Sequence, residues 1–248
     1  TVYLAYYDDV QDQIRFRYGT VGNGRGDFNN FVDNEGLGST TKDSDRNWNN
    51  SRKYVFESNT ANFSLIAGAD WQNYANRENA NTGLTKKVGN NYFYDTGYEA
   101  DAYVAIDVVK GTSADKDIVV AVWYDGKDCY YAYNTAPHSG KDNGKAGGWT
   151  TKKIFSGGGE YCTIKVDSNK GIHIAANVDG ALKYAYLSSY AAAYTEATQA
   201  IKIDSCAITG EQINIDVGIK NGHQIPYISY YMSASKKPCI AYITENAI

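Results

Sequence analysis

Five carboxylates near the ends of expected strands are the candidates for acid–base chemistry. Glycoside hydrolysis needs two carboxyl groups about 5 to 10 Å apart, one of them kept protonated by an apolar setting. Two of the five, both glutamates, stand just before corresponding strands of successive repeats, which favours a structural role. A glycosidase-like enzyme is therefore the alternative hypothesis. The five candidates are Asp101, Asp107, Glu160, Glu211 and Asp216.

The histidines and cysteines do not form a metal-binding pattern. His138, His173 and His223 are far apart in the sequence, and there is neither an HExxH motif nor a CxxC pair. We therefore expect no transition-metal site. Four cysteines are too few for a disulfide-built scaffold of this length, so we expect them to be buried, unreactive thiols. They are Cys129, Cys162, Cys206 and Cys239.

Two short motifs lie in a segment rich in Gly and Asn. Asp43, Asp45 and Asn47 place oxygen ligands at alternate positions, as calcium loops do. Trp48 and Tyr54 stand where an EF-hand needs Gly and Glu, so an EF-hand is excluded and an irregular Ca²⁺ site is the alternative to a solvated loop. The triplet at 25–27 is Arg-Gly-Asp, which an integrin could reach, but chance occurrence is the favoured explanation.

A recurring Tyr-rich hairpin organises the chain. A short apolar strand ends in an aromatic residue and Asp, and a tight turn leads into a second strand rich in tyrosine. The copies follow one another at 53 to 62 residues, a spacing typical of repeat folds. We expect these hairpins at 2–18, 63–76, 118–134, 172–187 and 226–244, with an irregular insertion at 19–58.

Further strands are expected between the hairpins. Tyr103–Val108, Tyr161–Val166 and Ile213–Val217 alternate apolar with polar or small residues, the pattern of a strand with one buried face. Each of them follows another candidate strand, and Trp149–Phe155 and Ala200–Ile203 are the clearest of these. We therefore expect four strands per repeat, the hairpin supplying the third and fourth.

The copies in the second half resemble bacterial repeats of a "YISYYD…LKYAY" type from sialidase-like and other extracytoplasmic β-propellers. Tyr227–Tyr231 and Leu182–Tyr186 carry the resemblance. It implies a fold and a broad role rather than a reaction. Sialidase activity would require arginines from several blades and Asp-box turns, whereas all six arginines lie within residues 15–77 and no Asp box is present.

We predict an all-β chain that forms a single five-bladed β-propeller domain over residues 1–248, with one incomplete blade. Four short antiparallel strands per repeat favour this arrangement over a two-sheet sandwich. Strands from residues 20–58, a longer parent protein, or a partner chain would complete the open blade, since an unpaired edge invites strand addition.

The expected ligand site lies on the loop face of this propeller. The loops at 134–148 and 187–199 and the insertion 19–58 are long and would converge there. Exposed aromatic side chains stack on sugar rings or anchor protein partners. The site residues that we predict are Trp48, His138, Trp149, Tyr190, Tyr194 and His223.

Composition narrows the function class. A formal net charge of -4 gives no basic field for nucleic acid, and no apolar run is long enough to span a membrane. Loops dense in Asn, Gly, Ser and Tyr suggest an extracytoplasmic surface, as in a secreted, periplasmic or cell-surface adhesion protein. We expect a non-catalytic recognition module that binds a glycan or a protein. The alternatives are the glycosidase-like enzyme and a docking platform for another chain.

Overall fold

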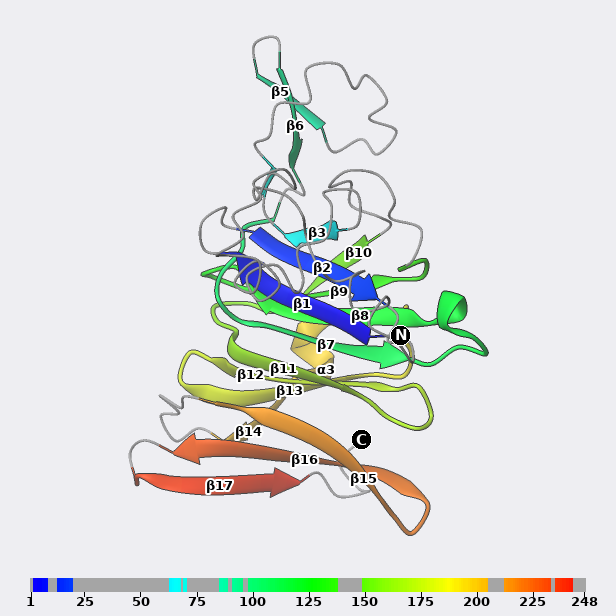
Figure 1. The fold of residues 1–248 in the computed structure, drawn as a ribbon. Helices are drawn as coiled ribbons and strands as arrows, with labels where there is room; N and C mark the ends of the chain where they lie inside the picture. Colours follow the sequence, from blue (N-terminus) through cyan, green and yellow to red (C-terminus); the bar gives the residue numbers. More distant parts are fainter. Residues whose placement is uncertain are drawn as a thin grey trace, which may run out of the picture. The chain divides into compact units, whose positions relative to one another are not determined.

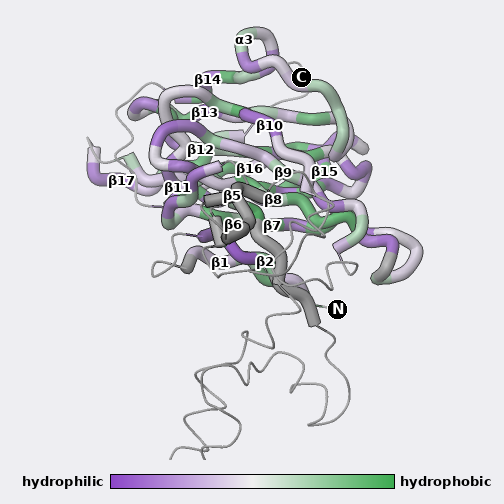
Figure 2. The backbone as a smooth tube through the Cα atoms, turned by 90° about the horizontal axis from the view of Figure 1, so that it is seen from above, coloured by the Kyte–Doolittle hydropathy of each residue, from purple (hydrophilic) through white to green (hydrophobic). Residues whose placement is uncertain are grey.

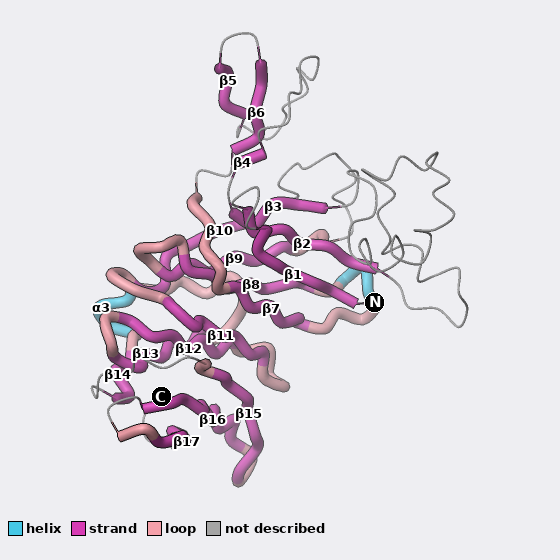
Figure 3. The backbone as a smooth tube through the Cα atoms, turned by 60° about the vertical axis from the view of Figure 1, so that its left-hand side comes forward, coloured by secondary structure: helices cyan, strands magenta, loops and turns pink. Residues whose placement is uncertain are grey.

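The chain is built of short antiparallel strands. The computed structural model describes residues 2–8, 13–19, 63–67, 69–70, 85–88, 91–95, 98–137, 149–204, 212–232 and 235–242. Helical structure in these ranges is limited to short pieces that include α3 (Glu196–Gln199) and a 3₁₀ turn (Ala114–Lys116), as Figure 3 shows. No helix of the described ranges has the length and apolar character needed to cross a membrane. The prediction of an all-β fold made of small antiparallel sheets is confirmed.

The chain divides into two compact units. The first comprises residues 1–97 and 136–148, and the second comprises residues 98–135 and 149–248. The first unit holds a sheet in the order β1-β2-β3 and another in the order β4-β6-β5. Their strands are β1 (Val2–Asp8), β2 (Gln13–Gly19), β3 (Phe63–Ala67), β4 (Ala69–Asp70), β5 (Thr85–Val88) and β6 (Asn91–Asp95).

The second unit contains three sheets that follow one another along the chain (Figure 1). The first sheet has the order β10-β9-β8-β7, from β7 (Val104–Val109), β8 (Ile118–Tyr124), β9 (Cys129–Asn134) and β10 (Trp149–Phe155). The second has β11 (Glu160–Val166), β12 (Ile172–Val178), β13 (Ala181–Leu187) and β14 (Ile201–Asp204), in that order. The third has β15 (Asn214–Lys220), β16 (His223–Met232) and β17 (Lys237–Tyr242), in that order.

The Tyr-rich hairpin occupies the middle of each four-stranded sheet. β12 and β13 lie between β11 and β14, and β8 and β9 lie between β7 and β10. The sequence-based grouping, which made the hairpin the third and fourth strands, was therefore wrong. Trp149–Phe155 pairs with β9 and ends the first sheet, rather than opening the second. The alternation of residues identifies each strand but not its partner. The predicted sheets were therefore displaced by one strand along the chain.

Four of the five expected hairpins are present as antiparallel strand pairs, namely β1–β2, β8–β9, β12–β13 and β16–β17. At 63–76 the structure differs, because Phe63–Ala67 pairs with β2 and Ala69–Asp70 pairs with β6. Residues 71–76 lie outside the described ranges. The first unit thus gains a third strand beside its hairpin.

Asp residues shape the turns of the central hairpins. Asp179 and Gly180 form a two-residue turn, and their φ angles of 52° and 72° suit the type I′ geometry of a tight hairpin. The β8–β9 connection is longer, and there the Asp125 carboxylate accepts hydrogen bonds from the backbone N–H groups of Lys127 and Asp128. Turn chemistry thus explains why the Asp recurs at this point of the repeat.

Apolar layers lie between successive sheets of the second unit. β11 contacts β7 on one side and β15 on the other, so the first strands of the three sheets lie side by side. One buried cluster joins the first and second sheets, through residues such as Val122, Tyr131 and Ile174, and a second joins the second and third sheets. Figure 2 shows the strongly hydrophobic β8 within this unit. Each sheet therefore buries one face against the next.

Candidate functional site

An open cleft of about 960 Å³ lies where the first strands of the three sheets of the second unit begin. Residues at the start of β7, β11 and β15 form one part of its wall, and the end of β16 with the start of β17 forms the other. The cleft is lined by Ala102, Tyr103, Val104, Tyr161, Cys162, Gln212, Ile213, Asn214, Ser229, Tyr230, Tyr231, Pro238, Cys239 and Ile240.

Three residues that line the cleft have the same spacing in the sequence from one row that the three sheets share. Asp107 of β7 pairs with Val120 of β8, Lys165 of β11 with His173 of β12, and Asp216 of β15 with Tyr227 of β16. Asp107, Lys165 and Asp216 therefore occupy the same row in their three sheets. The residues four positions earlier in the chain are Tyr103, Tyr161 and Gln212, and all three line the cleft.

Two of these three residues have an unusual backbone conformation. Tyr161 has φ 54° and Gln212 has φ 91°, in the left-handed region that non-glycine residues rarely adopt. In β11 this coincides with an irregular register between Glu160 and Thr163, as in a β-bulge. Backbone strain of this kind concentrates at binding sites, where the surrounding fold holds it in place. Both residues line the cleft.

The aromatic part of the cleft is a pair of tyrosines. The rings of Tyr103 and Tyr161 have centroids 4.6 Å apart and are tilted by 55°. A hydrogen bond between the two phenol groups, helped by burial, raises the pKa of Tyr103 to about 12. The nearby carboxylates of Glu160 and Asp101 act in the same direction on the Tyr103 pKa. The Tyr103 phenol is therefore uncharged at neutral pH, and the pair offers aromatic surface and hydroxyl groups to a ligand.

The polar groups of the cleft wall are neutral. Among the described residues the lining contains phenols, thiols, a hydroxyl and two carboxamides, but no Lys, Arg, Asp or Glu. The carboxamides belong to Gln212 and Asn214, both of which are exposed. Ser229 supplies the hydroxyl from the opposite strand. Such a surface offers stacking and hydrogen bonds without charge, and it suits an uncharged polar ligand better than an anion or a cation.

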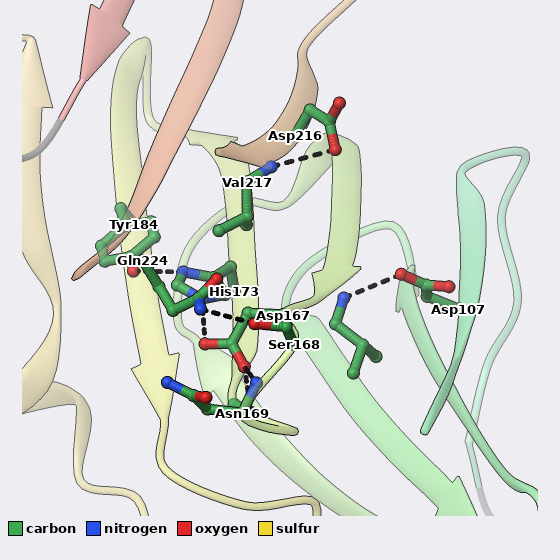
Figure 4. Close-up of polar contacts among 11 residues, drawn as sticks. Asp107, Asp167, Ser168, Asn169, His173, Tyr184, Asp216, Val217 and Gln224 are labelled. Carbon is green, nitrogen blue, oxygen red and sulfur yellow. Dashed lines mark hydrogen bonds and ion pairs between the residues drawn. The ribbon is translucent and has the colours of Figure 1, made fainter. Parts of the chain in front are cut away.

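The carboxylates named as acid–base candidates have other surroundings. Asp107 accepts hydrogen bonds from the backbone N–H groups of Val108, at 2.8 Å, and Val166, at 2.7 Å. Figure 4 shows the Asp107 side chain with one bond to a backbone N–H. Asp216 accepts one from Val217 and lies 3.3 Å from the ammonium group of Lys165. These bonds tie strands together or satisfy local backbone.

The other three acid–base candidates do not form a reaction centre in the cleft. Asp101 accepts a bond from the N–H of Ala102, and Glu160 is exposed at the start of β11. Neither of them is among the residues that line the cleft. Glu211 lies outside the described ranges. The described part of the cleft therefore has no pair of carboxylates that could share a substrate.

Three of the expected loop-face residues, Trp149, Tyr190 and His223, lie at the other end of the strands. Trp149 begins β10, His223 begins β16, and Tyr190 and Tyr194 follow β13. In the second sheet, Val166 at the end of β11 pairs with Ile172, which pairs with Leu187 at the end of β13. The cleft lies at the opposite end of β11, where the strand begins. None of the four lines the cleft. Trp48 and His138 lie outside the described ranges.

Tyr190 and Tyr194 pack against the buried cluster between the first two sheets. The backbone carbonyl of Tyr190 accepts a hydrogen bond from the Tyr131 hydroxyl at 2.9 Å, and its ring meets Tyr133 edge to face at 5.1 Å. Burial raises the pKa of Tyr194 above its usual range. Both tyrosines therefore help to cover the core between the first two sheets.

The second sheet contains a buried polar network (Figure 4). His173 lies between Asp167, at 3.0 Å from Nε2, and the Tyr184 hydroxyl, at 2.7 Å from Nδ1. Asp167 also accepts bonds from the backbone N–H groups of Asn169 and Gly171. The network fixes the β11–β12 turn, and its burial keeps it from reaching a ligand.

Two sequence-based expectations, about thiols and about transition metals, can be compared with the described residues. Cys129 and Cys162 are buried free thiols and Cys239 is a half-buried one, while Cys206 lies outside the described ranges. Within the described ranges, no group of three or more His, Cys, Asp or Glu side chains is placed to hold a metal ion. The calcium alternative at Asp43, Asp45 and Asn47, like the Arg-Gly-Asp triplet, falls on residues that the structure does not describe.

Comparison with known proteins adds no family. No protein-family model matches the chain, and no curated protein is significantly similar to it. The site must therefore be judged on its own geometry.

The sequence analysis missed the cleft although it contained a signal for it. Tyr103 and Tyr161 are the first residues of two copies of the recurring strand, and Gln212 directly precedes the third copy. A search for polar and aromatic residues at the same place in successive repeats would have found them. The positive φ angles at Tyr161 and Gln212 have no signature in the sequence, because both residues are of types that normally avoid this conformation.

Proposed function

We propose that the chain is a non-catalytic, extracytoplasmic recognition module that binds a neutral glycan in the cleft at the start of β7, β11 and β15. We further propose that its sheets are blades of a β-propeller, with these first strands nearest the axis. Small antiparallel sheets with adjacent first strands support this arrangement. In it, the cleft lies at the mouth of the central channel.

The observation that carries the proposal is the convergence of Tyr103, Tyr161 and Gln212, at or just before the first strands of three sheets, in one cleft. Sugar rings present an apolar face and a rim of hydroxyl groups. Tyrosine rings cover the apolar face, and phenol, carboxamide and serine groups bond the hydroxyls. The cleft supplies both, and its described wall carries no charge that would favour an ionic ligand. The same wall lacks carboxylates, which favours binding over glycoside hydrolysis.

A glycan array probed with the purified protein, followed by titration calorimetry on the best neutral oligosaccharide, tests the proposal. Gln212→Gly is the decisive variant. Glycine accepts φ 91° without strain, so this change removes the carboxamide while leaving the fold as stable or more stable. We expect affinity to fall about three- to tenfold, the effect of losing one hydrogen bond. Tyr161→Ala should weaken binding further.

Asn221→Gly is the matched control, because Asn221 also has a positive φ, 54°, but lies in the β15–β16 turn away from the cleft. It should leave affinity unchanged. Loss of binding in Trp149→Ala or Tyr194→Ala, with Gln212→Gly unaffected, would move the site to the loop end. Release of free sugar from the bound oligosaccharide would show that the chain is a glycosidase rather than a binding module. A glycan array on which the protein binds no glycan would overturn the proposal.

A further inference from the structure

Two buried cysteines face each other across the apolar layer between the first and second sheets of the second unit. Cys129 begins β9 and Cys162 lies near the start of β11, and both belong to the buried cluster that joins these sheets. Cys129 is 0% exposed and Cys162 is 7% exposed. A hydrogen bond joins the two thiol groups. Two sulfur atoms from different sheets are therefore in contact.

Backbone contacts hold this pair of thiols in place. The carbonyl oxygen of Tyr103 accepts hydrogen bonds from the Cys162 thiol, at 3.6 Å, and from the backbone N–H of Tyr124, at 3.1 Å. Tyr124 is the residue that pairs with Cys129 across the β8–β9 hairpin. Cys162 and the pairing partner of Cys129 are thus bound to the same carbonyl group, which fixes the positions of the two strands that carry the thiols.

The loop between β10 and β11 brings the second sheet against Cys129. A disulfide requires Cβ atoms about 3.5 to 4.5 Å apart, so the two backbones must run close together. Gly158 forms a parallel bridge with Asp128, and a Cβ atom at Gly159 would lie 2.6 Å from the Cβ atom of Cys129. The backbone that leads to Cys162 therefore passes directly beside Cys129.

We propose that Cys129 and Cys162 are joined by a disulfide when the chain folds in the presence of a small disulfide oxidant such as oxidised glutathione. The thiolate of one cysteine attacks a sulfur atom of the oxidant, so a mixed disulfide forms and one glutathione thiolate leaves. The thiolate of the second cysteine then attacks the cysteine sulfur of the mixed disulfide and releases the second glutathione. Two electrons pass to the oxidant, and the two protons lost by the cysteines end on the two glutathione thiols.

Burial decides when this bond can form. Only a thiolate attacks a disulfide, and burial raises the pKa of Cys129 well above its usual value, so the folded chain offers almost no nucleophile. The exchange must therefore take place while the layer between the two sheets is still open to solvent. The same burial then shields the finished bond from reductants. The folded chain thus keeps the redox state in which it folded, with the free thiols of this structure after reducing conditions and a disulfide after oxidising ones.

This inference does not depend on glycan binding. Disulfides form and persist outside the cytoplasm, so the extracytoplasmic location proposed above would supply the oxidising conditions. The bond would close a loop over residues 129–162, which contains β10, and would restrict the unfolded chain. Closing a loop of this length should raise the thermal unfolding midpoint by roughly 5 to 10 °C.

Refolding of the purified chain in two buffers tests the proposal, one with reduced and oxidised glutathione and the other with only a dithiol reductant. After refolding with glutathione, alkylation in denaturant without reductant should spare both cysteines. Peptide mass spectrometry should then find their two peptides cross-linked, with two hydrogen atoms fewer than the separate peptides. This protein should unfold roughly 5 to 10 °C above the protein refolded in reductant. Brief treatment of the folded protein with reductant should leave the bond intact.

Cys239→Ser is the matched control, because Cys239 lies on β17 and packs against the cluster between the second and third sheets. This variant should keep the cross-link and the difference in unfolding midpoint. Cys162→Ala should unfold at the same temperature after refolding in either buffer. Alkylation of both cysteines of the native chain after refolding with glutathione, or a link from either of them to Cys206 or Cys239, would overturn the proposal. These measurements use no glycan, so a failed glycan array would not affect them.

Discussion

The Nε2 atom of His173 lies 3.0 Å from the Asp167 carboxylate, and both side chains are 1% exposed. A carboxylate can only accept, so Nε2 carries the proton, and Nδ1 then accepts the hydrogen bond of the Tyr184 hydroxyl. This assignment places a neutral imidazole in the middle of the second sheet. Its three groups satisfy one another where water cannot.

Protonation of His173 links stability to pH. Burial lowers the pKa of His173 below its usual 6.5, and the Asp167 carboxylate only partly opposes this shift. The unfolded chain therefore binds the proton more readily, and the free energy of unfolding falls as pH drops below about 6.5. Urea denaturation at several pH values between neutral and mildly acidic measures the slope. His173→Gln should be flatter over the same range; an equal slope in both proteins would contradict this explanation.

Gly171 is packed too tightly for a side chain. A Cβ atom there would lie 2.6 Å from the Asp167 carboxylate and 2.7 Å from the Tyr186 ring. Gly171→Ala should therefore destabilise the protein by roughly 1–3 kcal/mol, the usual cost of overpacking. Gly222→Ala is the comparison, because it meets no atom within 4 Å and costs only about 1 kcal/mol for its φ of +82°. Thermal unfolding of the two variants should rank them in this order.

Asp107 ties the first sheet to the second through the backbone N–H of Val166. Asp107→Ala leaves that N–H without its acceptor and should cost about 1–3 kcal/mol of unfolding free energy. Asp216→Ala is the matched change at the same position of the third sheet. Its side chain is 80% exposed, so its pair with Lys165 is screened and the loss should stay below about 1 kcal/mol. Equal losses in the two variants would argue against the tie between sheets.

The buried thiols should be chemically silent. Burial, with a hydrogen bond between the two cysteines, raises the pKa of Cys129 well above its usual value, so almost no reactive thiolate forms. Alkylation followed by peptide mass spectrometry should leave Cys129 and Cys162 unmodified in the native protein and modify both in denaturant. Cys239 is half-buried and should react faster than either. Rapid native labelling of Cys129 would show that the core opens.

The local pattern of the strands could be predicted, but their grouping could not. Alternation and tyrosine content located β8, β9, β12 and β13 closely, because those features follow from one buried face per strand. Whether Trp149–Phe155 closes one sheet or opens the next depends on pairing across a long loop. Residues on either side of such a loop carry the same alternation in both cases, so only the structure could decide.

Turn length also misled the comparison of repeats. Aligning Asp125 with Asp179 matches Val122 to Ala176, whereas the strand pairing matches Val122 to Ala175. The cause is the longer turn after Asp125, which displaces the alignment of the two strands by one residue. A displacement of one residue matches side chains that lie on opposite faces of the sheet. The cleft was missed for a related reason. Its residues are distant in sequence and meet only because the first strands are adjacent.

The repeated rows across the three sheets of the second unit have an evolutionary consequence. Each sheet offers its neighbour the same arrangement of small and aromatic side chains, and Asp107 shows how a single carboxylate can join one sheet to the next. Duplication of one gene segment would therefore add a complete, already compatible layer, and deletion would remove one without redesigning the rest. Proteins of this construction can change length in whole-sheet steps while each remaining layer keeps its chemistry.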